Sequence, residues 1–287
     1  MQNPKLSIIT PVFQGSKYMA ECIESVAQQN CDTLEHIIID GGSTDGTVDI
    51  LKEYAAKYEH IRYISEKDEG QSSAMNKGLK MAKGAIIGFL NADDYYETNI
   101  LNRIVDLFSG LSDPSFIVGN CNVIDENKNI LEINKPKKLG YEDLLLGNGY
   151  NPLPVNPSAY FYHKSVHEKI GFYDESKYYL MDTDFILKVV TIANVKYIDE
   201  LWGHFRFIEG TKTYNANKDG SNSKRVQILM DSHINRLFLA KRLRIKILRY
   251  LHLKYFYKRL FYYLEKPKRI LLFFQKKDGI FKRMFKY

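Results

Sequence analysis

The first 90 residues of the chain alternate short apolar runs with longer amphipathic stretches. The apolar runs read KLSIITPVF (5–13), LEHIIID (34–40), IRYIS (61–65) and AIIGFL (85–90). The intervening stretches, 17–29, 46–58 and 71–83, have the spacing of helices. Strands that are apolar throughout and separated by helices of about 10 to 15 residues are typical of right-handed βαβ units and of a parallel sheet covered on both faces. The pattern therefore predicts an α/β fold with a mostly parallel, Rossmann-like sheet.

Polar residues follow the end of each apolar run. The four segments are TPVF (10–13), DGGSTDGT (40–47), SEKDEG (65–70) and NADD (91–94). In such sheets ligands bind beyond the carboxyl ends of the strands. Carboxylates that gather there repel one another and raise each other's pKa, so a bound cation or a set of hydroxyl donors is expected. The alternative for each segment is a turn or helix cap, for which Asp, Asn, Ser and Gly are common.

The form of these loops indicates how a nucleotide would be held. Neither the dinucleotide fingerprint G-x-G-x-x-G nor the phosphate loop G-x-x-x-x-G-K-[ST] occurs in the chain. Mn²⁺ and Mg²⁺ accept carboxylate, diphosphate and water oxygens in octahedral geometry, so one or two protein carboxylates suffice. NADD has that composition, so a nucleotide site in this chain, if there is one, would hold its phosphates by a metal.

Charge divides the chain into two regions. Residues 224–287 contain 19 Lys and Arg against three acidic residues, whereas the other residues contain 22 basic and 31 acidic residues. This division predicts one domain over 1–221 and a basic helical region over 222–287. Leu, Ile, Phe and Tyr alternate with the cations in an amphipathic pattern that Pro267 interrupts, which indicates contact with an anionic membrane surface. A helix packed on the acidic first domain is the alternative.

The absence of targeting segments and the pattern of cysteines bear on the location of the protein. Residues 1–30 lack the features of a secretory signal, and no apolar run approaches the roughly 18 residues of a spanning helix. We expect a cytoplasmic protein at the inner face of the cell membrane. Cys22, Cys31 and Cys121 form no C-x-x-C pair, so reduced, structural thiols are expected.

Four segments together resemble a known family. They are SIITPVFQGSKYMAECIESVAQQ, HIIIDGGSTDGTVDIL, SEKDEGQSSAMNKGLKMAKGAIIGFLNADDYY and KIGFYDESKYYLMDTDF. In this order, over roughly residues 5–210, the chain resembles the family 2 glycosyltransferases of bacterial surface-polysaccharide synthesis, which have the GT-A fold. The resemblance implies an inverting transfer of a hexosyl or N-acetylhexosaminyl group from a nucleotide-sugar, with a UDP-sugar expected first. The implied acceptor is a hydroxyl of a saccharide, expected to be lipid-linked.

The resemblance also implies a nucleotide site. Its residues would be Thr10, Pro11 and Phe13 around the base and ribose, Asp40 as an acceptor from the base, and Asp68 with Asn76 beside them. Asn91 stands where the family often has Asp, so its ribose contact would come from an amide. Asp93 would bind the metal, Mn²⁺ or Mg²⁺, and Asp94 would support it.

The acceptor side is implied by MDTDF. Asp182 would be the catalytic base and Asp184 its structural neighbour, whereas a helix N-terminal acid is the alternative for Asp182. Asn156 and Pro157 stand near the place where relatives often carry a His-Gln pair, so no acceptor contact is carried over there. Arg206 is a candidate for the diphosphate and His204 for the metal; a structural role is the alternative for both.

Two other functions are compatible with parts of the sequence. A nucleotidyltransferase shares a sheet of this kind and a metal-held nucleotide, but it needs no acceptor-side acid at Asp182. The basic, tyrosine-rich C-terminus would suit a nucleic-acid-binding protein, for which salt-sensitive binding by residues 224–287 alone is the discriminating observation. The glycosyltransferase interpretation accounts for all four segments and needs no nucleic-acid partner.

Overall fold

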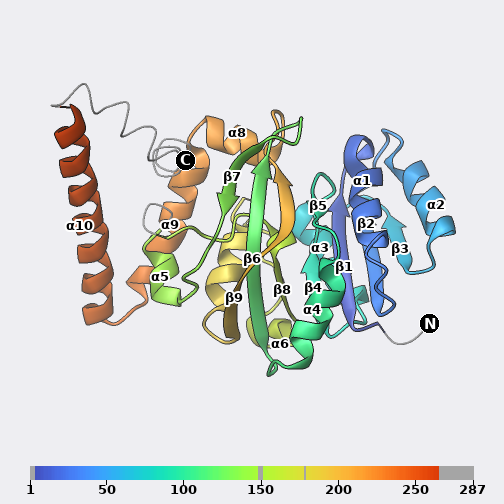
Figure 1. The fold of residues 1–287 in the computed structure, drawn as a ribbon, viewed down its shortest axis with the longest axis horizontal. Helices are drawn as coiled ribbons and strands as arrows, with labels where there is room; N and C mark the ends of the chain where they lie inside the picture. Colours follow the sequence, from blue (N-terminus) through green and yellow to red (C-terminus); the bar gives the residue numbers. More distant parts are fainter. Residues whose placement is uncertain (1–3, 148–150, 178, 265–287) are drawn as a thin grey trace. The chain divides into compact units, whose positions relative to one another are not determined.

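The computed structural model describes residues 4–147, 151–177 and 179–264 (Figure 1). The chain forms two compact units. The first comprises Met1–Pro136 and Pro154–Phe207, and the second comprises Lys137–Leu153 and Ile208–Tyr287. The boundary predicted between residues 221 and 222 falls inside the second unit, where a helix begins at Ser221.

The first unit is built on a nine-stranded sheet with the order β3-β2-β1-β4-β8-β6-β9-β5, and β7 pairs with β6. The strands are β1 Leu6–Val12, β2 Leu34–Asp40, β3 Ile61–Ser65, β4 Ile86–Phe89, β5 Tyr95–Tyr96, β6 Ser115–Ile124, β7 Ile130–Asn134, β8 Tyr160–His163 and β9 Asn194–Arg206. The helices are α1 Ser16–Ala27, α2 Thr47–Lys57, α3 Gln71–Met81, α4 Ile100–Ser109, η1 Pro157–Ala159, α6 Val166–Ile170 and α7 Met181–Val189.

The βαβ units predicted from the apolar pattern are confirmed. β1 pairs in parallel with β2 and β4, and β2 pairs in parallel with β3. All seven residues of β1 and of β2 are buried, as expected of strands covered on both faces. The carboxyl ends of these four strands therefore lie at one edge of the sheet.

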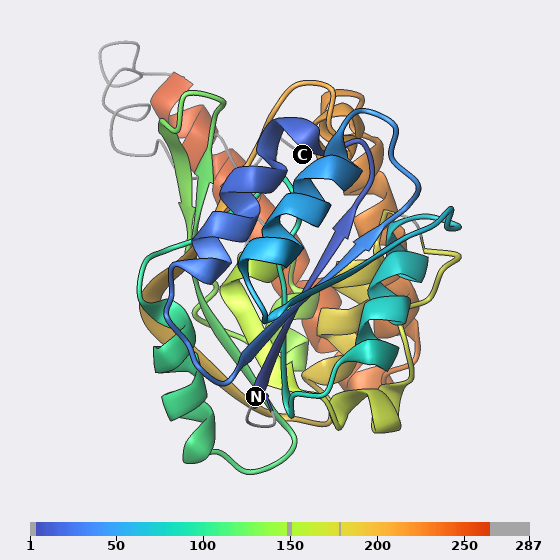
Figure 2. The same cartoon turned by 90° about the vertical axis from the view of Figure 1, so that its right-hand side faces the viewer.

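Helices cover both faces of this parallel part. Leu6 and Ile8 of β1 share a core with Met19 of α1, and residues of α2 and α4 belong to the same core. Ile9 points to the opposite face, where α3 approaches so closely that a Cβ on Gly78 would lie 2.3 Å from Ile9 Cγ2. Figure 2 shows α1 and α2 side by side over the sheet.

The second half of the sheet is mixed. β8 runs antiparallel to β4 and β6, β5 runs antiparallel to β9, and β6 runs parallel to β9. β5 follows NADD directly, so its pairing with the end of β9 brings residues 93–96 and 203–206 together.

The second unit is helical. Its helices are α5 Tyr141–Leu145, α8 Lys212–Lys218, α9 Ser221–Asn235 and α10 Leu239–Leu264. Tyr141 Oη and His233 Nδ1 are 2.8 Å apart, which joins α5 to α9. The predicted interruption at Pro267 lies outside the described residues. In the part of the chain that the structure describes, no helix is long and apolar enough to cross a membrane.

Candidate active site

The loops that follow β1 and β2 are tied to each other. The Gln14 backbone N–H donates to Ser43 Oγ at 2.7 Å, and the Gln14 side chain exchanges hydrogen bonds with Thr44 at 3.1 and 2.9 Å. Asp45 Oδ2 accepts a hydrogen bond from the Ser16 N–H at 2.9 Å, which connects the α2 entrance to the start of α1. The segment GGSTDGT therefore joins the loops that follow β1 and β2 at the carboxyl edge of the sheet.

The side chain of Asp40 stabilises the loop that follows β2. Its buried carboxylate accepts hydrogen bonds from Gly42 N at 3.1 Å, Ser43 N at 3.1 Å, Ser43 Oγ at 2.5 Å and Ser65 Oγ at 2.7 Å. Gly42 and Gly46 have φ angles of 87° and 98°, a left-handed conformation that favours glycine. This segment therefore adopts the turn that the sequence offered as the alternative to a ligand-binding role. The contact of Asp40 with a nucleobase remains a prediction.

The three residues predicted at the end of β1 have different environments. Thr10 is buried, and its Oγ1 lies 2.9 Å from His36 Nε2. Pro11 is buried in the strand. Phe13 lies just past the strand with 65% of its surface exposed. Of the three, Phe13 has the side chain that is available to a ligand without rearrangement.

Asp68 and Asn76 also differ. Asp68 is half-buried. Its carboxylate lies close to the loop after β2, since a Cβ built on Gly41 would be 3.0 Å from Asp68 Oδ2. Asn76 is buried; its Nδ2 donates to Tyr173 O at 2.9 Å and Glu175 Oε1 at 3.0 Å, and its Oδ1 accepts from Tyr173 N at 2.9 Å. Asp68 lies at the predicted edge, whereas the Asn76 amide fastens the segment before α7.

Asp94 joins three elements behind the edge. Its Oδ2 accepts from Asn91 Nδ2 at 2.9 Å and from Asn156 Nδ2 at 2.7 Å, and its Oδ1 accepts from the Arg206 backbone N–H at 2.9 Å. Complete burial raises the pKa of Asp94 well above its usual range, and the neighbouring charge of Asp93 raises it further. Asp94 thus fixes the end of β4 to η1 and β9, and its support of a metal remains a prediction.

Asp93 has the features of a cation ligand. Burial raises the pKa of its carboxyl, and the Arg206 charge partly opposes that rise. Among the described residues, no other residue donates a hydrogen bond to this carboxylate. A carboxylate beyond a strand end that accepts no hydrogen bond from another residue suits a hard divalent cation, and the metal role of Asp93 remains a prediction. The described residues contain no group of three or more His, Cys, Asp and Glu that could hold a metal ion, so substrate oxygens and water would complete the coordination.

Arg206 is buried, with 1% of its surface exposed, and holds the same edge from β9. Its Nη1 donates to the Asp93 carbonyl and its Nη2 donates to Glu21 Oε2, both at 2.5 Å. The guanidinium carbon lies 4.8 Å from the centre of the Tyr18 ring and 4.9 Å from that of Tyr95. These contacts support the structural alternative for Arg206, and its contact with a diphosphate remains a prediction.

Replacing Arg206 should therefore destabilise the first unit. We expect Arg206→Ala to lower the free energy of unfolding by about 3 kcal/mol, because it removes the hydrogen bonds of a buried guanidinium and leaves a void between two tyrosine rings. Urea unfolding measures the change. The matched control is Arg103→Ala, which removes an exposed 3.1 Å pair with Glu200 and should cost less than about 1 kcal/mol. Equal losses in the two variants would contradict this role.

His204 is engaged in the β5 and β9 pair. Its Nε2 lies 3.1 Å from Glu97 Oε2, and its ring stacks on Tyr95 with the ring centres 4.4 Å apart. These contacts give His204 a structural role in holding β5. A role as a metal ligand remains a prediction.

Asp182 lies in the first turn of α7, where its Oδ1 accepts a hydrogen bond from Tyr160 Oη at 3.3 Å. Asp184 is buried one half-turn further on, and its carboxylate pairs with Lys177 at 2.5 Å and Lys188 at 2.7 Å. Asp182 is partly exposed, whereas the buried Asp184 carboxylate is engaged by two lysines. The role of Asp182 as the catalytic base, with Asp184 as its structural neighbour, remains a prediction.

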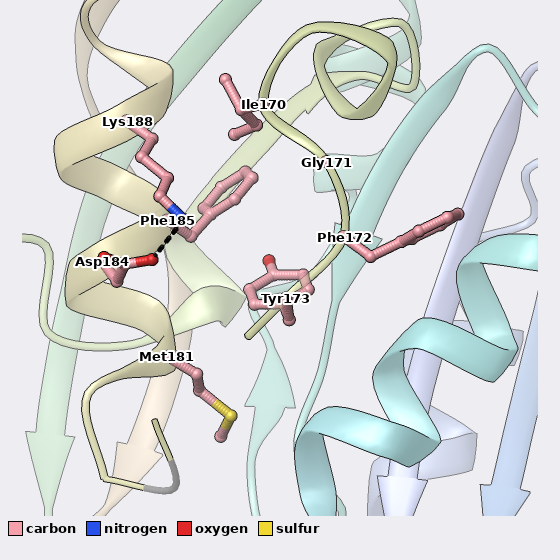
Figure 3. Close-up of a pocket in the computed structure, with 8 residues that line it drawn as sticks. All are labelled: Ile170, Gly171, Phe172, Tyr173, Met181, Asp184, Phe185 and Lys188. Atoms are coloured by element: carbon pink, nitrogen blue, oxygen red, sulfur yellow. Dashed lines mark ion pairs between the residues drawn. The ribbon is translucent and has the colours of Figure 1, made fainter. Parts of the chain in front are cut away.

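A small pocket lies beside α7 (Figure 3). It is lined by Ile170, Gly171, Phe172, Tyr173, Met181, Asp184, Phe185 and Lys188. Figure 3 shows the Asp184 and Lys188 pair on the helix, with Tyr173 of the preceding loop on the side of the helix and Phe172 pointing away from it. Its mostly apolar wall and internally paired charges indicate packing around α7.

A continuous series of contacts joins the two predicted halves of the site. Asn91 Oδ1 accepts from Gln71 Nε2 at 3.1 Å at the start of α3. The next residue, Ser72, contacts Met181 with Oγ to Sδ at 2.9 Å. Met181 directly precedes Asp182. The end of β4, the start of α3 and the start of α7 therefore surround one edge.

Several residues that shape this edge were missed by sequence reasoning. Tyr160 contacts Asp182, and Glu21, Tyr18 and Tyr95 enclose Arg206. Their partners lie far away along the chain, and no local motif marks them. The sequence drew attention to Asn156 only because relatives often have a His-Gln pair near this position. Its hydrogen bond to Asp94 was not predicted.

The geometry and the sequence now define the class of the protein. Residues 7–171, more than half of the chain, match the model described as Glycosyl transferase family 2, and the chain belongs to this family. Chondroitin synthase of Escherichia coli is 30% identical over 249 residues, which are 83% of this chain and 34% of that protein. An uncharacterized glycosyltransferase of Rickettsia typhi is 30% identical over 203 residues, 69% of this chain and 63% of that protein. The chain thus spans between about a third and two thirds of these relatives.

Solved structures confirm the GT-A-like fold. S. aureus TarS 1-349 in complex with UDP-GlcNAc superposes with a TM-score of 0.63 and 20% identity over 84% of this chain and 70% of that chain. The mannosyltransferase PcManGT from Pyrobaculum calidifontis, in complex with GDP-Man and Mn²⁺, gives a TM-score of 0.57 and 14% identity over 99% and 88% of the two chains. At these identities the likeness concerns the fold.

Proposed function

We propose that the protein is an inverting glycosyltransferase that moves a hexosyl or N-acetylhexosaminyl group from a nucleotide-sugar to a hydroxyl of a saccharide acceptor. The observation that carries this proposal is the series of contacts from Asn91 through α3 to Met181, which supports a donor-side carboxylate at Asp93 and an acceptor-side acid at Asp182 on the same edge of the sheet. The family supports the reaction type.

The donor would occupy the carboxyl edge of β1 to β4. Phe13 offers an exposed ring for stacking on a nucleobase, and Asp68 follows β3 and approaches Gly41 in the loop after β2. Asp93 would hold Mn²⁺ or Mg²⁺, which when bound offsets negative charge on the departing nucleoside diphosphate. The complexes of fold neighbours with UDP-GlcNAc and with GDP-Man and Mn²⁺ support a nucleotide-sugar of this kind, and a UDP-sugar is our first expectation.

Asp182 would act as the general base. It accepts the proton of the acceptor hydroxyl while that oxygen bonds to the anomeric carbon and the bond from this carbon to the diphosphate oxygen breaks. A carboxylate is a weak base toward a hydroxyl, so positioning contributes much of the rate. The Tyr160 hydroxyl supplies positioning, since it is anchored in a buried strand and donates to the Asp182 carboxylate.

The acceptor would be a lipid-linked saccharide at the inner face of the cell membrane. The basic residues of 224–287 support this assignment, because an anionic leaflet attracts each Lys or Arg near its surface. Membrane contact would keep the protein at the surface that carries such an acceptor.

Donor binding tests the proposal without knowledge of the acceptor. Saturation-transfer NMR against a panel of UDP-, GDP- and dTDP-sugars with diamagnetic Mg²⁺ should show contact to at least one donor, with strong signals from the base protons next to Phe13. Phe13→Ala should weaken those base signals. Absence of binding by every member of the panel would contradict the assigned donor class.

A further inference from the structure

Helix α10 turns a row of apolar side chains away from its own unit. Leu239, Leu243, Ile247 and Leu251 recur every four residues, so they share one face with Tyr250, and all five are exposed. We call these five residues the outer ridge. On an ordinary surface helix the apolar stripe faces the core and the opposite face is polar. The outer ridge therefore has the character of a contact surface.

The inward side of the same helix is occupied. Ile245 is buried with 1% of its surface exposed. Lys241 pairs with Glu142 at 2.8 Å, and Arg249 pairs with Asp231 at 3.0 Å. Packing within the second unit thus accounts for these residues and leaves the outer ridge without a role there.

The outer ridge is interleaved with cations. α10 contains eight basic and no acidic residues: Lys241, Arg242, Arg244, Lys246, Arg249, Lys254, Lys258 and Arg259. Lys246 and Lys254 each follow a ridge leucine by three residues, which places them beside the ridge. Within the part of the chain that the structure describes, neither forms an ion pair.

We infer that the outer ridge, with Lys246 and Lys254, lies in the surface of an anionic lipid bilayer. A helix of this composition rests in the headgroup region, with its apolar side chains reaching the acyl boundary and its cations at the phosphates. A second copy of the chain fits less well, because two ridges in contact would oppose cations with cations. This surface specifies the membrane contact included in the proposed function and rests on that function for its purpose.

Vesicle flotation of the full chain tests the inference. We expect recovery with vesicles of phosphatidylcholine mixed with phosphatidylglycerol, little recovery with phosphatidylcholine alone, and loss of recovery at high salt. Lys246→Gln with Lys254→Gln should lower the partition coefficient about 30-fold, from roughly fivefold for each cation. Ile247→Gln should lower it severalfold. Its matched control is Ile228→Gln on α9, which changes an isoleucine that is 61% exposed, against 54% for Ile247, and should leave flotation unchanged.

Flotation needs neither donor nor acceptor, so its outcome is separate from that of the proposed reaction. Equal recovery of the Ile247 and Ile228 variants, or no recovery of the parent protein, would overturn the inference. The same holds if light scattering shows a dimer that Ile247→Gln dissociates while lipid binding persists, since the ridge would then be an interface between copies.

Discussion

Asp182→Asn should abolish most sugar transfer while leaving donor binding intact. Asn retains the size of the side chain but cannot accept the proton of the acceptor hydroxyl. We expect turnover to fall by a factor on the order of 10²–10⁴, the usual contribution of a general base. Release of nucleoside diphosphate measures turnover, with water as the acceptor, and calorimetric titration of the nucleoside diphosphate measures binding.

The neighbouring acids provide the controls. Asp174→Asn changes an acid paired with Lys177 in the loop before α7 and should leave turnover near the parent value. Asp184→Asn should instead lower stability, because it weakens two ion pairs of a buried carboxylate. Near-parental turnover in Asp182→Asn would remove Asp182 as the base.

Asp93→Ala should remove metal-dependent binding of the nucleoside diphosphate. The substitution deletes the protein carboxylate that suits the cation, and a bound cation is worth several kcal/mol of charge stabilisation, so affinity should fall on the order of 10²- to 10³-fold. Calorimetry with Mn²⁺ present and then chelated measures the change. The fold should persist, because burial already disfavours the charge on Asp93.

The control for this variant is Asp49→Ala, which removes an exposed acid of α2 paired with Lys52 and should leave affinity unchanged. Unchanged affinity of Asp93→Ala for the nucleoside diphosphate would contradict the role of Asp93 as a metal ligand. Loss of affinity that is the same with and without Mn²⁺ would also contradict it, since the carboxylate would then act without a cation.

The parallel half of the fold could be predicted from the sequence because its strands are buried on both faces. Their apolar runs and the helices between them have periods that a single sequence displays, and the predicted elements over residues 5–90 are confirmed. The rule that ligands bind at carboxyl strand ends then located the candidate edge. The family resemblance was confirmed by the match over residues 7–171.

The different contacts of the residues at this edge of the sheet could not be predicted in the same way. Asp93 and Asp94 are adjacent and identical in type, yet Asp94 accepts hydrogen bonds from Asn156 and from the backbone of Arg206, residues that lie 62 and 112 positions away. Tyr18 and Tyr95 enclose Arg206 from two other segments. Such assignments depend on long-range packing, which no local motif encodes.

The most direct test of the account is to follow the phosphorus products formed from nucleotide-sugars by ³¹P NMR. Glycosyl transfer breaks the bond at the anomeric carbon, whereas nucleotidyl chemistry breaks a bond within the diphosphate. We predict that the protein with Mn²⁺ releases nucleoside diphosphate from at least one UDP-, GDP- or dTDP-sugar, observed after a chelator has removed the paramagnetic Mn²⁺, and that Asp182→Asn and Asp93→Ala both suppress this release. Formation of sugar phosphate or nucleoside monophosphate instead would contradict a glycosyltransferase and favour a nucleotidyltransferase.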